Sequence, residues 1–142
     1  IMLKSLHHVP VELMDMAFEE IARVLHPGGL AYISEPVYAG DFNEILRLFN
    51  DERQVRAAAF EATQRAVDHG RLLLEREVHF LSPSRFEGFE EFERRVLGAT
   101  HSQFDVDDAL HAQIRERFKP HIGSDGIAHF LNPLRVDLLR KP

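Results

Sequence analysis

Residues 1–36 follow an order of apolar and amphipathic segments that strongly restricts how this chain folds. Ile1–Leu3 is short, apolar and followed by polar residues, as at the end of a buried strand. From Pro10 onwards apolar residues recur at spacings of three and four, which predicts an amphipathic helix that Pro27–Gly29 ends. Leu30–Ser34 is apolar on both faces, which is typical of a parallel strand covered by helices. This order predicts a right-handed parallel crossover.

The remainder of the chain predicts helices that cover the sheet and two antiparallel strands. Helical periodicity with small alanines dominates residues 41–70, and two further helical stripes, the first of them rich in phenylalanine, extend over 82–126. Apolar and polar residues alternate over 72–81 and again over 127–140, with an interruption at Asn132. The second stretch is therefore one long bent strand or two short ones, paired antiparallel with the first. The expected fold class is α/β.

The composition narrows the possible functions. The chain has 142 residues, 44% of them hydrophobic, which suits a single domain over 1–142 with a substantial core. A net charge of −6 argues against a broad nucleic-acid-binding surface, which needs clustered cations. No apolar run approaches the ~20 residues of a membrane span, and no secretory leader is visible. The absence of Cys excludes disulfides and Cys-ligated zinc. We expect a cytoplasmic protein that binds neither nucleic acid nor a membrane.

Four motifs occur in a distinctive order along the chain. They are SLHHVP at Ser5–Pro10, RVLHPGGL at Arg23–Leu30, ISEP at Ile33–Pro36 and NPLRVDLL at Asn132–Leu139. The first three resemble the middle of class I S-adenosylmethionine-dependent methyltransferases, where they span the fourth strand, the following helix and the fifth strand of a doubly wound sheet. The last motif looks like the final strand of that family. The resemblance is strong over residues 1–36, weaker over the tail and nearly absent between them.

The resemblance implies S-adenosyl-L-methionine as the cofactor, yet one part of the family's pattern is missing. In the family the cofactor sits at a Gly-rich turn after the first strand, where the backbone approaches it closely. Here Gly28 and Gly29 lead from a helix into a strand, so they form a helix end and not a cofactor turn. We therefore interpret the chain as the C-terminal half of a Rossmann-like methyltransferase sheet with inserted helices. This fragment should be inactive alone, and the cofactor belongs to the intact protein.

The opening residues predict an interaction between copies of the chain. The family's strand order places the first strand beside the fourth, so a chain that begins at the fourth exposes an unpaired apolar edge. We expect a homodimer of the fragment through the edge strand at residues 1–6. The alternative to an enzyme is a non-catalytic half-fold that serves as an interaction or dimerisation module.

Candidate site residues follow from the rule that open α/β sheets bind ligands beyond the carboxyl ends of their strands. By resemblance, the segment containing Lys4, Ser5 and Leu6 lines the amino-acid end of the cofactor, mostly through its backbone. Tyr38 follows the second strand and is a candidate for orienting the substrate. We expect that substrate, the methyl acceptor, to be a small and at least partly hydrophobic molecule. A stripe of phenylalanines at 86–92 could form a lid, although such a stripe is more often core.

Three further residues are candidates for catalysis. His7 or His8 could act as a base, because an imidazole titrates near neutral pH. Glu35 could orient the substrate. The alternatives are that one of the two rings caps the following helix while the other is solvated, and that Glu35 is a solvated carboxylate at a strand end. A metal site at the two histidines is a weak interpretation, because no third ligand stands at a suitable spacing.

Overall fold

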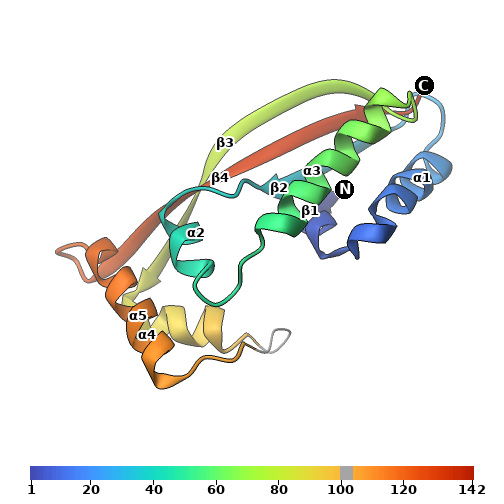
Figure 1. Cartoon of the computed structure of the whole chain (residues 1–142). Coiled ribbons are helices and arrows are strands. Elements are labelled where there is room, and N and C mark those ends of the chain that lie inside the picture. Colours follow the sequence, from blue (N-terminus) through green and yellow to red (C-terminus); the bar gives the residue numbers. More distant parts are fainter. Residues whose placement is uncertain (100–103) are drawn as a thin grey trace. The chain divides into compact units, whose positions relative to one another are not determined.

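The computed structural model describes residues 1–99 and 104–142, which form an α/β structure around a four-stranded mixed sheet (Figure 1). The strands are β1 (Met2–Leu3), β2 (Leu30–Pro36), β3 (Leu73–Glu87) and β4 (Ile127–Arg140). Their order in the sheet is β1-β2-β4-β3. β1 and β2 are parallel, and the other neighbours are antiparallel.

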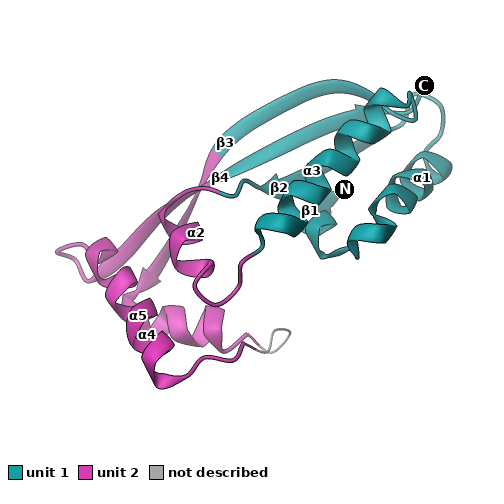
Figure 2. Cartoon of the chain, in the orientation of Figure 1, with its two compact units in different colours: residues 1–38, 52–80, 133–142 teal, residues 39–51, 81–132 magenta. Residues whose placement is uncertain are grey.

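The five α-helices of the described residues divide between two compact units (Figure 2). They are α1 (Met14–Val24), α2 (Asp41–Leu46), α3 (Arg53–Asp68), α4 (Gly88–Phe92) and α5 (Asp108–Phe118). Unit 1 consists of residues 1–38, 52–80 and 133–142, and unit 2 of 39–51 and 81–132. Each unit is discontinuous in sequence, so no linker marks its boundaries. None of the helices in the described ranges has the length and apolar character needed to cross a membrane.

The two parallel strands joined by a helix that were predicted for residues 1–36 are confirmed in unit 1. Met2 lies opposite Ile33 in the parallel pair of β1 and β2, and α1 connects the two strands. A 3₁₀ turn at Val11–Leu13 separates the predicted helix start at Pro10 from the first residue of α1. Gly28 adopts a φ of +77°, which an L side chain disfavours, and its N–H donates to the carbonyl of Lys141 at 2.9 Å.

The core of unit 1 forms where α1 and α3 pack together and against the sheet. Ala59, Ala62 and Ala66 of α3 are each at most 1% exposed, which confirms that the small residues serve close helix packing. The other buried members of this cluster are Leu6, Met14, Phe18, Ala31, Ile33, Leu72 and Leu139. Ala31, Ile33 and Leu139 belong to β2 and β4, so they mark the face of the sheet that these helices cover.

The C-terminal stretch forms one continuous strand rather than two short ones. β4 pairs antiparallel with β2, with Ala31 opposite Leu139 and Glu35 opposite Arg135. The sequence predicted only the pairing with the preceding strand, whereas β4 lies between β2 and β3. Its central position explains why apolar residues occur on both of its faces: Val136 and Leu139 are buried on opposite sides.

β3 is longer than the sequence predicts. Helical cover was expected from residue 82, but β3 continues to Glu87 and the helices begin at Gly88, so that prediction is wrong over 82–87. Phe86 therefore belongs to a strand and not to the helical stripe. Ser82, Ser84 and Phe86 are the less exposed side of this segment, and Asn132 Nδ2 donates to Ser82 O at 3.0 Å and Ser84 Oγ at 2.9 Å. The less exposed positions 82 and 84 carry serines rather than apolar residues, so the alternation of apolar and polar residues that predicts a strand is lost there.

The core of unit 2 is a cluster of aromatic rings. Phe92 and Phe118 are fully buried, and their centroids lie 5.0 Å apart. Phe86 and Phe89 contact both rings, which confirms that the phenylalanine stripe is core and not a lid. Asp107 caps α5 by accepting a hydrogen bond from the Leu110 N–H at 2.7 Å, which fixes the helix that presents Phe118.

Candidate functional site

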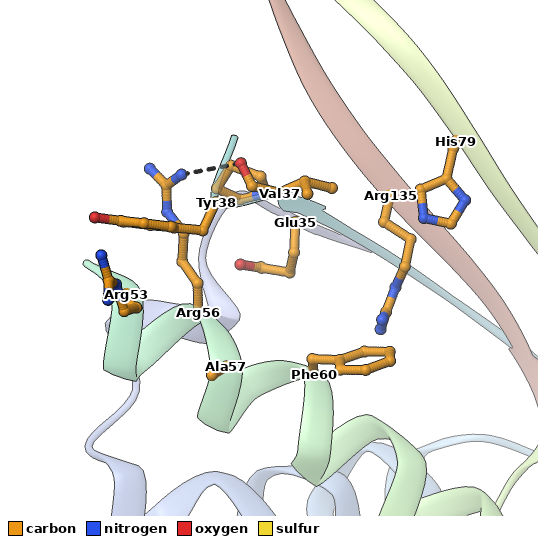
Figure 3. Close-up of a pocket in the computed structure, with 10 residues that line it drawn as sticks. Glu35, Val37, Tyr38, Arg53, Arg56, Ala57, Phe60, His79 and Arg135 are labelled. Carbon is orange, nitrogen blue, oxygen red and sulfur yellow. Dashed lines mark hydrogen bonds between the residues drawn. The ribbon is translucent and has the colours of Figure 1, made fainter. Parts of the chain in front are cut away.

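A cavity of about 360 Å³ lies in unit 1 at the carboxyl end of β2 (Figure 3). Its lining comes from β2 and the residues after it, from α3, and from single residues of β3 and β4. These residues are Glu35, Pro36, Val37, Tyr38, Arg53, Arg56, Ala57, Phe60, His79 and Arg135. The volume is at the lower end of the range of small-molecule sites. The cavity lies where ligands bind open α/β sheets.

The sheet face under α3 becomes more polar toward this cavity. Its cross-strand pairs run from Ala31 with Leu139, through Ile33 with Asp137, to Glu35 with Arg135. The first pair is entirely apolar and buried, and the last carries two opposite charges that both line the cavity. The same strands thus supply core at one end and charged groups at the other.

The Glu35 carboxylate binds the segment that follows β1. Its Oε1 accepts hydrogen bonds from the Ser5 N–H at 3.0 Å and the Leu6 N–H at 2.8 Å. Its Oε2 accepts from the His7 N–H at 3.4 Å and from His7 Nδ1. Consecutive backbone amides and an imidazole of one segment therefore hold one carboxylate from the next strand. The side chain of Glu35 is only 13% exposed, so Glu35 is not a solvated carboxylate at a strand end, which was the alternative to a functional role.

This environment keeps Glu35 ionised at neutral pH. Burial by itself raises the pKa of the carboxyl, but hydrogen bonds from the His7 ring and the Leu6 and Ser5 amides, with the charge of His7, bring the pKa below its usual value of 4.5. An ionised carboxylate only accepts hydrogen bonds, so the role of Glu35 in this geometry is to position its donors.

Acidification should remove the stabilisation that Glu35 provides. Because its pKa is lowered in the folded chain, this stabilisation is complete above the ordinary glutamate pKa and is lost as the pH falls through the folded value. We expect the difference in unfolding free energy between the wild type and Glu35→Gln to shrink between about pH 5 and pH 3. Urea unfolding at a series of pH values measures it, with the exposed Glu20→Gln as the control. A difference that grows toward acid would contradict this assignment.

The two predicted histidines have different surroundings. His7 is 6% exposed, and its Nδ1 is bonded to the Glu35 carboxylate. His8 is exposed, and its ring centroid lies 4.1 Å from that of His7. A carboxylate that orients an imidazole is the arrangement by which many general bases are positioned. The catalytic roles of both rings stay predictions.

The predicted cofactor segment has its backbone largely satisfied within the chain. The N–H groups of Ser5 and Leu6 donate to Glu35, and their carbonyl oxygens accept from His8 N at 3.2 Å and Val9 N at 2.9 Å. Lys4 is exposed at a φ of +51°, and its N–H donates to Ser34 O at 2.7 Å. A cofactor held here would contact second lone pairs of carbonyl oxygens and the Lys4 and Ser5 side chains. The role of the three residues stays a prediction.

Tyr38 lines the cavity, beside the residues of α3. The Arg53 Cζ lies 5.1 Å from its ring centroid, a cation–π distance, and Arg56 donates to the carbonyl of the preceding Val37 at 3.3 Å. The Tyr38 hydroxyl is buried and has no hydrogen-bond partner among the described residues. A buried hydroxyl without a partner is costly. Its predicted substrate role stays a prediction.

The charged and aromatic residues that form the opposite walls of the cavity were not predicted from the sequence. Arg53, Arg56 and Phe60 stand at helical spacing on one side of α3, next to the exposed Ala57. On β4, Arg135 and Asp137 share a face with the buried Leu139, because alternate residues of a strand point the same way. Charged residues at core positions of a strand were the signal that could have identified this wall.

Arg135 and Asp137 form a buried ion pair beside the cavity. Asp137 Oδ2 accepts from Arg135 Nε at 2.9 Å and from Nη2 at 2.6 Å, and the two side chains are 11% and 4% exposed. Burial raises the pKa of Asp137 above its usual 3.8 and outweighs the hydrogen bonds and charge of Arg135 that lower it. The Arg135 Cζ also lies 3.8 Å from the centroid of the Phe60 ring. Two partners therefore hold the guanidinium in place.

Comparison with known proteins does not identify this site. Neither a scan against protein families nor a search among curated proteins finds a match.

Proposed function

We propose that this chain is the C-terminal half of a class I S-adenosylmethionine-dependent methyltransferase that acts on a small molecule. The observation that carries the proposal is the contact between two of its motifs. Glu35 of ISEP accepts hydrogen bonds from Ser5 and Leu6 of SLHHVP, although 29 or more residues separate them in sequence. Motifs whose order resembles the family thus meet at one point, beside a cavity of ligand size.

The sheet supports the same assignment. The resemblance implies parallel strands followed by an antiparallel pair, and the chain has a parallel β1–β2 pair joined by α1, with β4 antiparallel beside β2. The cavity lies at the carboxyl end of β2, where a doubly wound sheet binds its ligands. These features fit a substrate-binding half.

This chain contains only part of the binding site that the family uses for the cofactor. S-adenosylmethionine supplies an electrophilic methyl group, and its main binding element in the family is a Gly-rich turn that this sequence lacks. Residues Lys4–Leu6 offer at most contacts to one end of the cofactor, since their amides are already bonded. The proposed half is therefore inactive alone and contributes groups that act on the acceptor.

Each site residue has a defined task in this proposal. Glu35 anchors the segment after β1 and orients the His7 ring, so it is a positioning residue. His7 stays the predicted base for a hydroxyl or amine acceptor, although its side chain is only 4% exposed and does not line the cavity. Tyr38 and the residues of α3 hold the acceptor in the cavity.

Calorimetric titration with S-adenosylmethionine tests the proposal. This chain alone should show no binding of S-adenosylmethionine at micromolar concentrations. The same reading frame, extended upstream to include a strand, a Gly-rich turn and an acidic residue about 20 positions later, should bind it. Micromolar binding of S-adenosylmethionine by this chain alone would contradict the proposal that its cofactor site is incomplete. An extended chain that does not bind S-adenosylmethionine would contradict the proposed methyltransferase function.

The interaction module is the second candidate function. It is favoured by the edge position of β1 in the sheet and by the exposure of Leu3, which is 64%. An edge strand with an apolar exposed residue is a template for pairing with another chain. The titration separates the two functions, because a docking module has no reason to gain S-adenosylmethionine binding when it is lengthened.

A further inference from the structure

The wall of the cavity in unit 1 contains an arginine with one edge still available. A guanidinium carries five N–H donors, arranged along a side edge and a terminal edge. Asp137 occupies the side edge of Arg135, formed by Nε and Nη2. The terminal edge, formed by Nη1 and the second N–H of Nη2, has no partner within residues 1–99 and 104–142. This edge has the fork geometry that binds a carboxylate through two parallel hydrogen bonds.

The structure holds this arginine rigidly. Asp137 accepts from two of its nitrogens, and the Phe60 ring lies against its plane, with Cζ 3.8 Å from the ring centroid. The Arg135 side chain is only 11% exposed, so it does not reach out to solvent as surface arginines do. A donor fixed in advance loses little entropy when a ligand binds. Figure 3 shows its guanidinium above Phe60, among the residues that line the cavity.

The remaining lining defines the rest of the ligand. Pro36, Val37, Ala57 and the Phe60 ring supply apolar surface, and about 360 Å³ has room for a single substituted ring. The lining carries more positive than negative charge, from Arg53, Arg56 and Arg135 against Glu35. The whole chain, in contrast, has a net charge of −6. Glu52 pairs with Arg56, and Asp137 pairs with Arg135. Asp137 accepts from the side edge of Arg135 and does not occupy its terminal edge.

We infer that the cavity binds a small apolar carboxylic acid, of the size of a substituted benzoate, with its carboxylate on the terminal edge of Arg135. This rests on the proposed function and names the class of its methyl acceptor. The carboxylate is the anchor in this arrangement, so the atom that receives the methyl group lies elsewhere on the ligand. Arg135 is thereby the residue that selects the acceptor.

Three probes with the same ring test the inference on the full chain by isothermal titration. Benzoate, benzamide and benzylamine carry a negative, a neutral and a positive group. Benzoate should bind at least about tenfold more tightly than benzamide, the ratio expected for one charge-assisted hydrogen bond, and benzylamine should bind most weakly. Equal affinity for benzoate and benzamide would overturn the inference.

A paired variant isolates Arg135. Arg135→Gln alone would leave the Asp137 carboxylate buried without a partner, so the double variant Arg135→Gln with Asp137→Asn is used. In this double variant benzoate should bind no more tightly than benzamide, so the preference for the carboxylate disappears. Arg140→Gln is the matched control, because Arg140 lies on the same strand, is 43% exposed and pairs with Glu75 outside the cavity. An equal loss in this control would overturn the assignment.

A second variant keeps the test decisive if the double variant does not fold. Ala57 is exposed on α3 and lines the cavity, so Ala57→Leu fills the space without altering any charge. It should weaken benzoate binding at least about tenfold. Benzoate binding that survives this change would place the site elsewhere. None of these titrations contains S-adenosylmethionine, so their failure leaves the methyltransferase proposal to its own experiment.

Discussion

Replacing Glu35 by alanine should lower the unfolding free energy by about 3–5 kcal/mol, which is much of the stability of a domain of this size. The substitution removes the acceptor of the Ser5 and Leu6 amides and the partner of the His7 ring at once. His7 and Leu6 are buried, so these donors do not regain water when the carboxylate is lost. Each unsatisfied buried donor costs about 1–3 kcal/mol.

Urea unfolding followed by circular dichroism measures this effect at neutral pH. Glu35→Gln should lie between alanine and wild type, because an amide keeps one oxygen acceptor but places an NH₂ against donors. Glu20→Ala is the matched control: Glu20 is 62% exposed and bonded only to Arg23, so its loss should cost less than about 0.5 kcal/mol. Similar losses for Glu35→Ala and Glu20→Ala would show that the contacts of Glu35 do not stabilise unit 1.

Replacing Phe118 by alanine should destabilise unit 2 by about 3–5 kcal/mol, the usual cost of deleting a fully buried phenylalanine. Phe118 is 0% exposed, and its ring contacts Phe86, Phe89, Phe92 and Phe130. Alanine leaves a cavity among rings that cannot easily collapse into it, because each is held by the others.

Amide exchange combined with urea unfolding locates this effect. The amides of α5 and α4 should lose more protection than those of α1, which belongs to unit 1. Leu131→Ala is the control, since Leu131 lies in unit 2 but is 59% exposed, and it should change the stability by less than about 1 kcal/mol. A uniform loss of protection over the whole chain would contradict two separately packed cores.

The stability and binding experiments address different parts of the site. Glu35 holds the segment after β1, whereas Arg135 presents its terminal edge to the cavity from the neighbouring strand. The two residues are cross-strand partners, yet each is bonded to a different group, Glu35 to His7 and Arg135 to Asp137. Substitution of either one therefore tests a separate function of the same strand pair.

Elements with strong local patterns could be predicted from the residues alone. Periodic apolar residues and the glycines at 28 and 29 predicted the crossover of residues 1–36, and the alanines of α3 predicted close helix packing. Such patterns succeed because one turn of helix or one pleat of strand repeats within a few residues. Their positions after the second predicted strand also selected Glu35 and Tyr38, which both line the cavity.

The contacts between residues far apart in the chain could be read only from the folded chain. Nothing local to β4 shows that it pairs with β2, and that pairing is what brings Arg135 opposite Glu35. Likewise, the partners of the Glu35 carboxylate lie on a segment 28 or more residues away. Hydrogen bonds and buried charges depend on contacts between segments far apart in the chain, whereas periodicity reports only on near neighbours. The position of Arg135 opposite Glu35 was therefore not predictable from local patterns.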